Sequence, residues 1–289
     1  MPRCPVLIAP ILRAGYTRFN ALSDRIPDVM NPTTFLRCAL FALCLGLGTV
    51  VAPAAQAEAP RLGFALGASL QYGPRYPGAD RYTAGAGGIF QLQDLRIGTL
   101  TLSDSDGWFD SDGTALRGSL RVQGARKASD NPELRGLEDL DAALELGGGI
   151  YHKTRAFQVY ADLRHGVVGH RGWVGEAGVD MFLRPAEGLT LAMGPRVGFA
   201  DGGYMRQYFG VTAPEAAASG LTEFTPGSGL YSAGIGIRAV YELNRDWAVL
   251  GSVGYDRLTG DAARSPITRQ GSRDQFSVSL GLGRVLRLH

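Results

Sequence analysis

Residues Arg61–Tyr72 read RLGFALGASLQY, and every second residue of this stretch is apolar or aromatic: Leu62, Phe64, Leu66, Ala68, Leu70 and Tyr72. Successive side chains of a β-strand point to opposite faces of the sheet, so the stretch predicts a strand with one apolar face. The other face carries small or polar residues such as Gly63, Gly67 and Gln71. The pattern is longer than the usual strand of about five or six residues. It is long enough for a tilted strand that crosses a bilayer, which needs about 9–11 residues.

A secretory leader precedes this strand. Arg37 is followed by the uncharged run Cys38–Ala52, and Ala55–Ala57 has the small-x-small pattern of a signal-peptidase site. We therefore expect cleavage after Ala57, which divides the chain into a leader with N-terminal extension (1–57) and a barrel (58–289). An uncleaved membrane anchor is the disfavoured alternative, because the apolar run is short. Residues 1–29 have no periodic pattern, which makes Met30 a candidate functional start.

Removal of the leader changes the composition. Without the leader's five arginines and two aspartates the chain has 24 basic and 25 acidic residues, so nothing indicates a nucleic-acid surface. All three cysteines lie in the leader, which leaves no disulfide and no thiol chemistry. No apolar run after residue 57 reaches the ~18 residues of a spanning helix. A membrane protein of this composition must be a closed β-barrel, because only helices and barrels satisfy the backbone in lipid.

The same alternation recurs along the chain and predicts strands over 61–72, 81–92, 95–103, 115–126, 140–151, 156–165, 172–184, 188–199, 230–242, 246–258 and 273–288. Short turns are expected at His152–Arg155, Pro185–Gly188 and Leu243–Asp246, and long loops at Asp201–Gly229 and Gly260–Ser272. Short turns that alternate with long loops are typical of outer-membrane barrels. Helical periodicity is absent, except for a turn or two near Glu133–Leu140 and Pro214–Ser219.

The apolar face must meet lipid in a membrane barrel. Tyr231 and Tyr241 share the apolar parity, and ten residues of strand tilted by about 40° rise about 25 Å, the height of the band between aromatic girdles. Glycine fills the opposite parity, as expected for a crowded interior. We therefore predict an all-β, antiparallel, transmembrane up-and-down barrel. An extra strand around Trp108-Phe109 gives the preferred twelve strands, and fusion of two candidates gives ten.

Several motifs, taken in order, resemble the MipA/OmpV family, the outer-membrane MltA-interacting proteins. The first is Pro74–Asp80, which contains Tyr76, Pro77, Gly78 and Asp80. Leu137–Leu140, Gly194–Arg196, Tyr208–Val211 and Ser219–Leu221 follow. The last is Leu258–Ile267, with Gly260, Asp261, Ser265 and Pro266, closed by Gly271-Ser272. Arg264 departs from the expected acidic or neutral residue, and the terminus Leu286–His289 lacks the usual final aromatic.

The resemblance implies a non-enzymatic scaffold in the outer membrane of a Gram-negative bacterium. Such a scaffold would dock a lytic transglycosylase and a bifunctional penicillin-binding protein, and its other partner would be outer-membrane lipid. The alternative is a small-solute or drug-permeable channel, or a surface adhesion protein of the porin type.

Sites for metals, cofactors or catalysis are not indicated. The acidic repeat from Asp104 to Asp112 lacks the closing glutamate of a calcium loop, because counting from Asp104 places Ala115 at position twelve. His165 and His170 have no cysteine or acidic partner between them, which disfavours zinc. A lipid hydrolase could use His165 as base, but no serine stands in a distinguishing context.

The loop Asp201–Gly229 is the candidate functional segment, because unstructured loops longer than about 12–15 residues are usually functional or disordered. Its aromatic residues could anchor a partner, fold inward as a plug or pack on the rim: Tyr204, Tyr208, Phe209 and Phe224. Interior charges could line a pore or pair into a plug: Glu145, Asp162, Arg164, Glu176, Asp180, Arg196 and Arg238.

Overall fold

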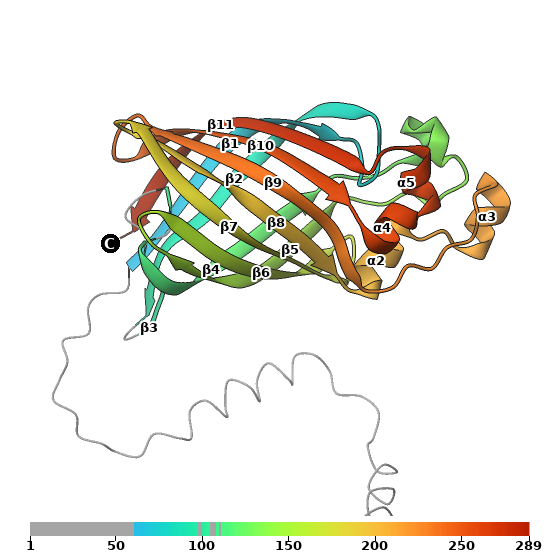
Figure 1. The fold of residues 1–289 in the computed structure, drawn as a ribbon, viewed down its shortest axis with the longest axis horizontal. Helices are drawn as coiled ribbons and strands as arrows, with labels where there is room; N and C mark the ends of the chain where they lie inside the picture. The colour runs from blue at the N-terminus through green and yellow to red at the C-terminus, as the bar shows by residue number, and fades with distance from the viewer. Residues whose placement is uncertain (1–60, 98–99, 105–107, 110, 289) are drawn as a thin grey trace, which may run out of the picture. The chain divides into compact units, whose positions relative to one another are not determined.

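The computed structural model describes residues 61–97, 100–104, 108–109 and 111–288 (Figure 1). The predicted leader, its cleavage site and Met30 lie outside these residues. Within these described residues, eleven strands form one antiparallel sheet. They are β1 (Arg61–Pro74), β2 (Tyr82–Ile97), β3 (Leu100–Asp104), β4 (Gly113–Gln123), β5 (Ala143–Lys153), β6 (Phe157–Val168), β7 (Trp173–Ala186), β8 (Leu189–Ala200), β9 (Gly229–Glu242), β10 (Trp247–Leu258) and β11 (Asp274–Leu288).

The sheet curls into a barrel in which each strand pairs with its neighbour in sequence, except that β3 and β4 do not pair within the described residues, and β1 pairs with β11. Leu66 lies opposite Arg284, and Tyr72 lies opposite Val278. At the two ends of the strand order, β4 contacts β2 and β3. The predicted up-and-down antiparallel barrel is therefore confirmed.

The extra strand expected around Trp108-Phe109, on which the preferred count of twelve depended, is not formed by these two residues. Trp108 and Phe109 form a bend, and Trp108 is buried inside the barrel against Ala65, Val240 and Val285. The Trp108 and Phe109 rings pack inside the barrel, and these two residues do not form an additional strand. Ten long strands and the short β3 remain, so the alternative count of ten is the better description of the barrel.

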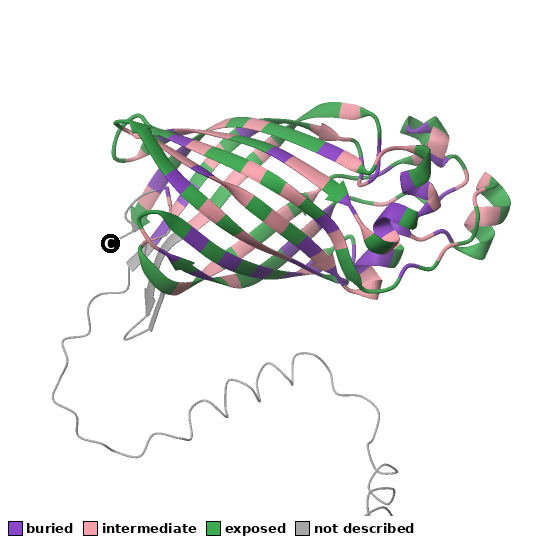
Figure 2. Cartoon of the chain, in the orientation of Figure 1, coloured by how far each residue is buried: buried purple, intermediate pink, exposed green. Residues whose placement is uncertain are grey.

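The apolar parity faces outward, as predicted. The chequered burial along the strands in Figure 2 reflects this alternation. Large apolar side chains are exposed around the whole wall, among them Leu70 (74%), Phe90, Leu116, Ile150, Met181, Ile235 and Leu280. On the other face glycine allows neighbouring strands and side chains to approach closely. A Cβ added to Gly147 would lie 1.9 Å from the Leu163 carbonyl oxygen, and one added to Gly149 would overlap the Asp162 carboxylate.

Tyr231 does not belong to the outer aromatic girdle that we predicted. The β8–β9 register shifts beside it, so that Ser232 pairs with Gly198 while Leu230 pairs with Phe199. This bulge turns the Tyr231 ring inward onto Tyr204 and Phe209, and Leu230 occupies the outer face. The girdle is better seen on β10, where Trp247 and Tyr255 share the outer parity about 26 Å apart along the strand.

Short helices gather at one end of the barrel, opposite the end at which β11 finishes (Figure 1). They are η1 (Ala128–Asp130), η2 (Pro132–Leu134), α2 (Gly202–Phe209), α3 (Ala213–Ser219), α4 (Gly260–Arg264) and α5 (Pro266–Gln270). In the described part of the chain no helix is long and apolar enough to span a membrane. We call this end the long-loop end, and the end with the turns 154–156, 187–188 and 243–246 the short-turn end.

Candidate functional site

Four loops at the long-loop end pack into a single cap, formed by residues 75–81, 124–142, 201–228 and 259–273. Its apolar centre combines side chains from all four loops: Tyr76, Ala79, Leu134, Leu137, Val211 and Ile267. The motifs that carry the family resemblance are scattered through the sequence, yet most of them meet in this cap.

The family-like residues of the first and last motifs contact each other directly. The Gly78 amide donates to the Gln275 side-chain oxygen at 3.0 Å, and the Ser272 amide donates to the Gly78 carbonyl at 2.9 Å. Gly78 has φ +95°, and an added Cβ would lie 2.8 Å from the Thr268 hydroxyl. Only glycine suits both the backbone conformation and the space.

Tyr76 and Ser265 anchor the cap from opposite sides. The buried Tyr76 hydroxyl donates to the Glu133 carboxylate at 3.0 Å, and burial, reinforced by Glu133, raises the pKa of this phenol. Ser265 caps α5 by accepting from the Ile267 amide, and its hydroxyl donates to the Phe209 carbonyl at 2.7 Å. Pro266 takes the first turn of α5, where its missing N–H costs nothing.

The other family-like positions are exposed or half-buried. Asp261 accepts from the Gly227 amide at 2.7 Å, and this bond lowers the pKa of the carboxyl group. Gly260 has φ +52° at the start of α4. The unexpected Arg264 is exposed and pairs with Asp261 one turn away. Pro77 is half-buried and Asp80 is exposed.

Three of the four candidate aromatic residues form a plug. α2 begins at the N-cap Asp201, whose carboxylate accepts from the Tyr204 amide at 2.8 Å. The helix directs Tyr204, Tyr208 and Phe209 into the barrel mouth, where each is at most 3% exposed. Burial raises the pKa of Tyr208 to about 12. These rings are occupied within the chain itself, which fits the plug alternative and leaves none of the three as an exposed anchor.

Phe224 and α3 close the outer side of the cap. Phe224 pairs with Val211 through two backbone hydrogen bonds of 2.9 Å and is half-buried. α3 starts with a capping box, in which Glu215 accepts from the Thr212 amide at 2.8 Å. Glu215 also accepts from the Glu138 amide at 3.0 Å, so it joins two loops. Burial opposes ionisation of Glu215, but these hydrogen bonds outweigh it and lower the pKa of the carboxyl group.

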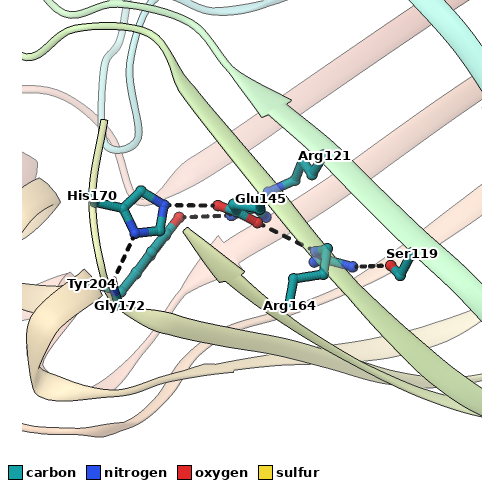
Figure 3. Close-up of polar contacts among 7 residues, drawn as sticks. All are labelled: Ser119, Arg121, Glu145, Arg164, His170, Gly172 and Tyr204. Atoms are coloured by element: carbon teal, nitrogen blue, oxygen red, sulfur yellow. Dashed lines mark hydrogen bonds and ion pairs between the residues drawn. The ribbon is translucent and has the colours of Figure 1, made fainter. Parts of the chain in front are cut away.

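Below the plug lies a buried polar cluster centred on Glu145, which is fully buried (Figure 3). Arg121 donates to Glu145 at 2.8 Å and to the Tyr204 hydroxyl at 3.1 Å. Arg164 donates to the other Glu145 oxygen at 3.3 Å and to the Ser119 hydroxyl at 3.0 Å. The cluster therefore joins β4, β5 and β6 to α2.

His170 belongs to this cluster, whereas His165 does not. The Gly172 amide donates to His170 Nδ1 at 3.1 Å, so the neutral ring carries its proton on Nε2 and donates to Glu145 at 3.3 Å. His165 lies on the outer face against Trp173, with ring centroids 4.7 Å apart. Within the described residues, no group of three or more metal-ligating side chains is present. Part of the acidic repeat, including Asp106 and Asp110, lies outside them.

Three further ion pairs join strands two apart on the inner wall, and each contains at least one of the predicted interior charges. Arg117 binds Asp162 through two hydrogen bonds of 2.9 and 2.6 Å, and Arg196 binds Asp256 through two of 3.2 Å. Arg238 lies 3.6 Å from Asp180. Of the two alternatives left open by the sequence, a charge-lined pore and charges that pair into a plug, these pairs favour the second. Arg117, Arg121 and Asp256 were not among the predicted residues, although their alternation on the inner parity could have identified them.

The short-turn end of the lumen is also filled. Trp108 packs against Ala65, Val240 and Ala248, and Phe109 packs edge-on against Phe182 with ring centroids 5.4 Å apart. Aromatic side chains thus occupy the interior near both ends of the barrel, and the paired charges lie between them.

A family model described as MltA-interacting protein MipA matches residues 66–286, which is nearly the whole barrel. The chain belongs to this family. Together with the apolar band around its wall, membership makes this MipA-family barrel an outer-membrane protein of a Gram-negative bacterium. By the usual orientation of such barrels, the short turns face the periplasm and the cap faces outward.

Two curated relatives are each named MltA-interacting protein, one from Escherichia coli (strain K12) and one from Shigella flexneri. Each is 26% identical over 148 residues, which cover 49% of this chain and 56% of the relative. The chain thus spans about half the length of the curated relatives it matches.

Solved outer-membrane proteins resemble this MipA-family barrel only distantly. An outer membrane channel from Pseudomonas putida F1 has a TM-score of 0.41 and 11% identity, over 82% of this chain and 100% of the channel. Ail from Yersinia pestis has a TM-score of 0.28 and 12% identity, over 78% of this chain and 99% of Ail. Neither likeness is close enough to bear on function.

Proposed function

We propose that this protein is a non-enzymatic scaffold that docks peptidoglycan-remodelling enzymes, foremost a lytic transglycosylase and with it a bifunctional penicillin-binding protein. Membership of the MipA family carries this proposal, because the matching relatives are named for their interaction with MltA. The plugged lumen supports a binding role over transport, since the buried polar cluster and the cap occupy the space that a pore would need.

The docking surface follows from the orientation of the barrel. Enzymes that act on peptidoglycan work in the periplasm, which the short-turn end faces. The turn 243–246 presents the exposed Leu243 (52%) and Arg245 there, beside Trp247. Arg155 and Arg184 lie in and beside the other turns and are also exposed. An exposed apolar side chain at an end that also carries exposed arginines is a suitable centre for a protein interface.

Binding of the soluble catalytic part of a lytic transglycosylase tests the proposal. The mature barrel in detergent should bind the enzyme, and the double variant Leu243→Asp/Arg245→Glu should bind at least about tenfold more weakly, or about 1.4 kcal/mol. Arg269→Glu, an exposed change in α5 at the opposite end, is the matched control and should leave binding unchanged. Absence of binding by the wild type, or weakening by the cap variant alone, would overturn the proposal.

The alternative function as a small-solute channel makes a different prediction in planar bilayers. With Trp108 at one end and α2 at the other, we expect brief or no openings from the pure protein. A steady open-state current would favour the channel over the scaffold.

A further inference from the structure

The middle of the lumen contains a chamber of about 370 Å³ between the Trp108-Phe109 pair and the polar cluster. Its charged lining consists of three carboxylates and three guanidinium groups: Asp162, Glu176, Asp180, Arg117, Arg196 and Arg238. The volume falls within the range of about 300–1,000 Å³ that is usual for small-molecule sites.

Serine hydroxyls line one side of this lumen. Ser252, Ser277 and Ser279 are on the inner parity of β10 and β11; Ser252 and Ser277 are exposed, and Ser279 is half-buried. The Ser252 and Ser279 hydroxyls lie 2.7 Å apart. Ser252 and Ser277 thus give the chamber a hydroxyl-bearing wall that suits a polar solute.

Three of the six charged groups have capacity left for a ligand: Glu176, Arg238 and Asp180, and Asp180 is the less exposed member of the Arg238–Asp180 pair. Arg117 and Arg196 are each held by two hydrogen bonds to a carboxylate. Arg238, by contrast, meets Asp180 only at 3.6 Å, and 47% of its side chain is exposed. Glu176 accepts from the Tyr160 hydroxyl at 2.9 Å, and among the described residues it has no cation within ion-pair distance.

Glycine keeps the space around these groups open. A Cβ at Gly236 or at Gly254 would lie 2.4 Å from the Arg196 guanidinium, so both positions must lack a side chain for Arg196 to reach Asp256. Arg238 itself rests on the Phe109 ring, with its guanidinium carbon 5.4 Å from the ring centroid. The cationic side of the chamber is thus held in place, while Arg238 still faces open space.

We propose that the chamber binds a small zwitterion such as an amino acid or a short peptide, with its ammonium group at Glu176 and its carboxylate at Arg238. A simple anion would meet the three carboxylates, and a simple cation would meet the three arginines. Only a ligand that carries both charges matches both sides, because opposed fixed charges favour a dipolar solute.

Titration of the mature barrel in detergent with four matched probes tests this site. The probes are glycylglycine (zwitterion), N-acetylglycine (anion), glycinamide (cation) and N-acetylglycinamide (neutral), and binding is measured by calorimetry and saturation-transfer NMR. We expect glycylglycine to bind at least about tenfold more tightly than each other probe. Equal binding of all four probes, or no binding of glycylglycine, would overturn the proposal.

Variants then assign the two contacts. Glu176→Gln and Arg238→Gln should each weaken glycylglycine at least about tenfold, whereas Arg238→Lys should restore part of the affinity. Arg287→Gln removes an exposed arginine that pairs with Asp246 at the short-turn end, and should change nothing. If Arg238→Gln fails to fold, Glu176→Gln and Arg238→Lys decide. Unchanged affinity for glycylglycine in Glu176→Gln would refute the site. The proposed docking of a transglycosylase is tested separately and does not depend on whether glycylglycine binds.

Discussion

Glu145 neutralises the buried Arg164 and the half-buried Arg121, and this makes it the residue on which the lumen most depends. Arg121 and Arg164 both donate to it, and His170 completes its shell. Charges removed from water must be paired and hydrogen-bonded, so the cluster is stable only when all its members are present.

We predict that Glu145→Gln destabilises the barrel by about 3–5 kcal/mol, because the buried Arg164 and the half-buried Arg121 would lose their counter-charge. Urea unfolding in detergent, followed by the heat-modifiable mobility of the barrel, measures this loss. Asp246→Asn, which breaks the exposed pair with Arg287, should change stability by less than about 0.5 kcal/mol. Equal effects of the two variants would show that the cluster is not held as a unit.

Ile237 tests the lipid-facing side at the level of one residue. It lies on the outer parity near the centre of β9, so Ile237→Arg should cost about 2–4 kcal/mol. Leu230→Arg places the same charge near the rim, where the cost falls to about 0–1 kcal/mol. Folding equilibria in lipid vesicles measure both, and a Leu230→Arg cost equal to that of Ile237→Arg would contradict the depth assignment.

Among the elements, the strands and the helical turn expected near Pro214–Ser219, which is α3, followed from the sequence, whereas the other α-helices did not. Alternation of apolar residues identified ten of the strands and all three short turns, because the lipid face must be apolar along its full length. α2, α4 and α5 have eight residues or fewer, which is too short for a helical period to emerge. The capping box at Thr212 and Glu215 was the available signal for α3.

Bulges and inward-turned aromatics were the other elements that alternation could not predict. Tyr231 matches the outer parity in the sequence, but one extra residue opposite Gly198 and Phe199 turns it inward. Trp108 and Phe109 resemble strand residues until the barrel interior is known. The four-loop cap likewise depends on contacts between residues as distant as Gly78 and Gln275.

We predict that α3 loosens at acid pH. The folded-state pKa of Glu215 is lowered from its ordinary 4.5, so its stabilising contribution is fully present above pH 4.5 and is lost as pH falls through the lower folded value. A nitroxide on Ala217→Cys should become mobile over that acid range and stay immobile above it. With Glu215→Gln added, the label should be mobile at neutral pH; a label that stays immobile there would contradict this role.

At the scale of the whole molecule, the barrel is an apolar cylinder with a charged and plugged interior. Its cap collects the family motifs on the outward-facing side, while the proposed docking surface lies at the periplasmic turns. This separation means that variants of the cap and of the turns should affect different properties. The positions of the cap, the plug and the docking surface all require that the apolar face of the wall meets lipid and that the glycine-rich face meets the lumen.

Spin-label accessibility at two adjacent residues of β10 tests that assignment most directly. Val253 and Ser252 are both exposed but lie on opposite faces, and residues 61–289 contain no cysteine to interfere. In lipid vesicles a nitroxide on Val253→Cys should collide readily with lipid-soluble oxygen and poorly with a water-soluble nickel chelate. The label on Ser252→Cys should show the reverse. If the label at Val253 favours the nickel chelate and the label at Ser252 favours oxygen, the apolar face does not meet lipid.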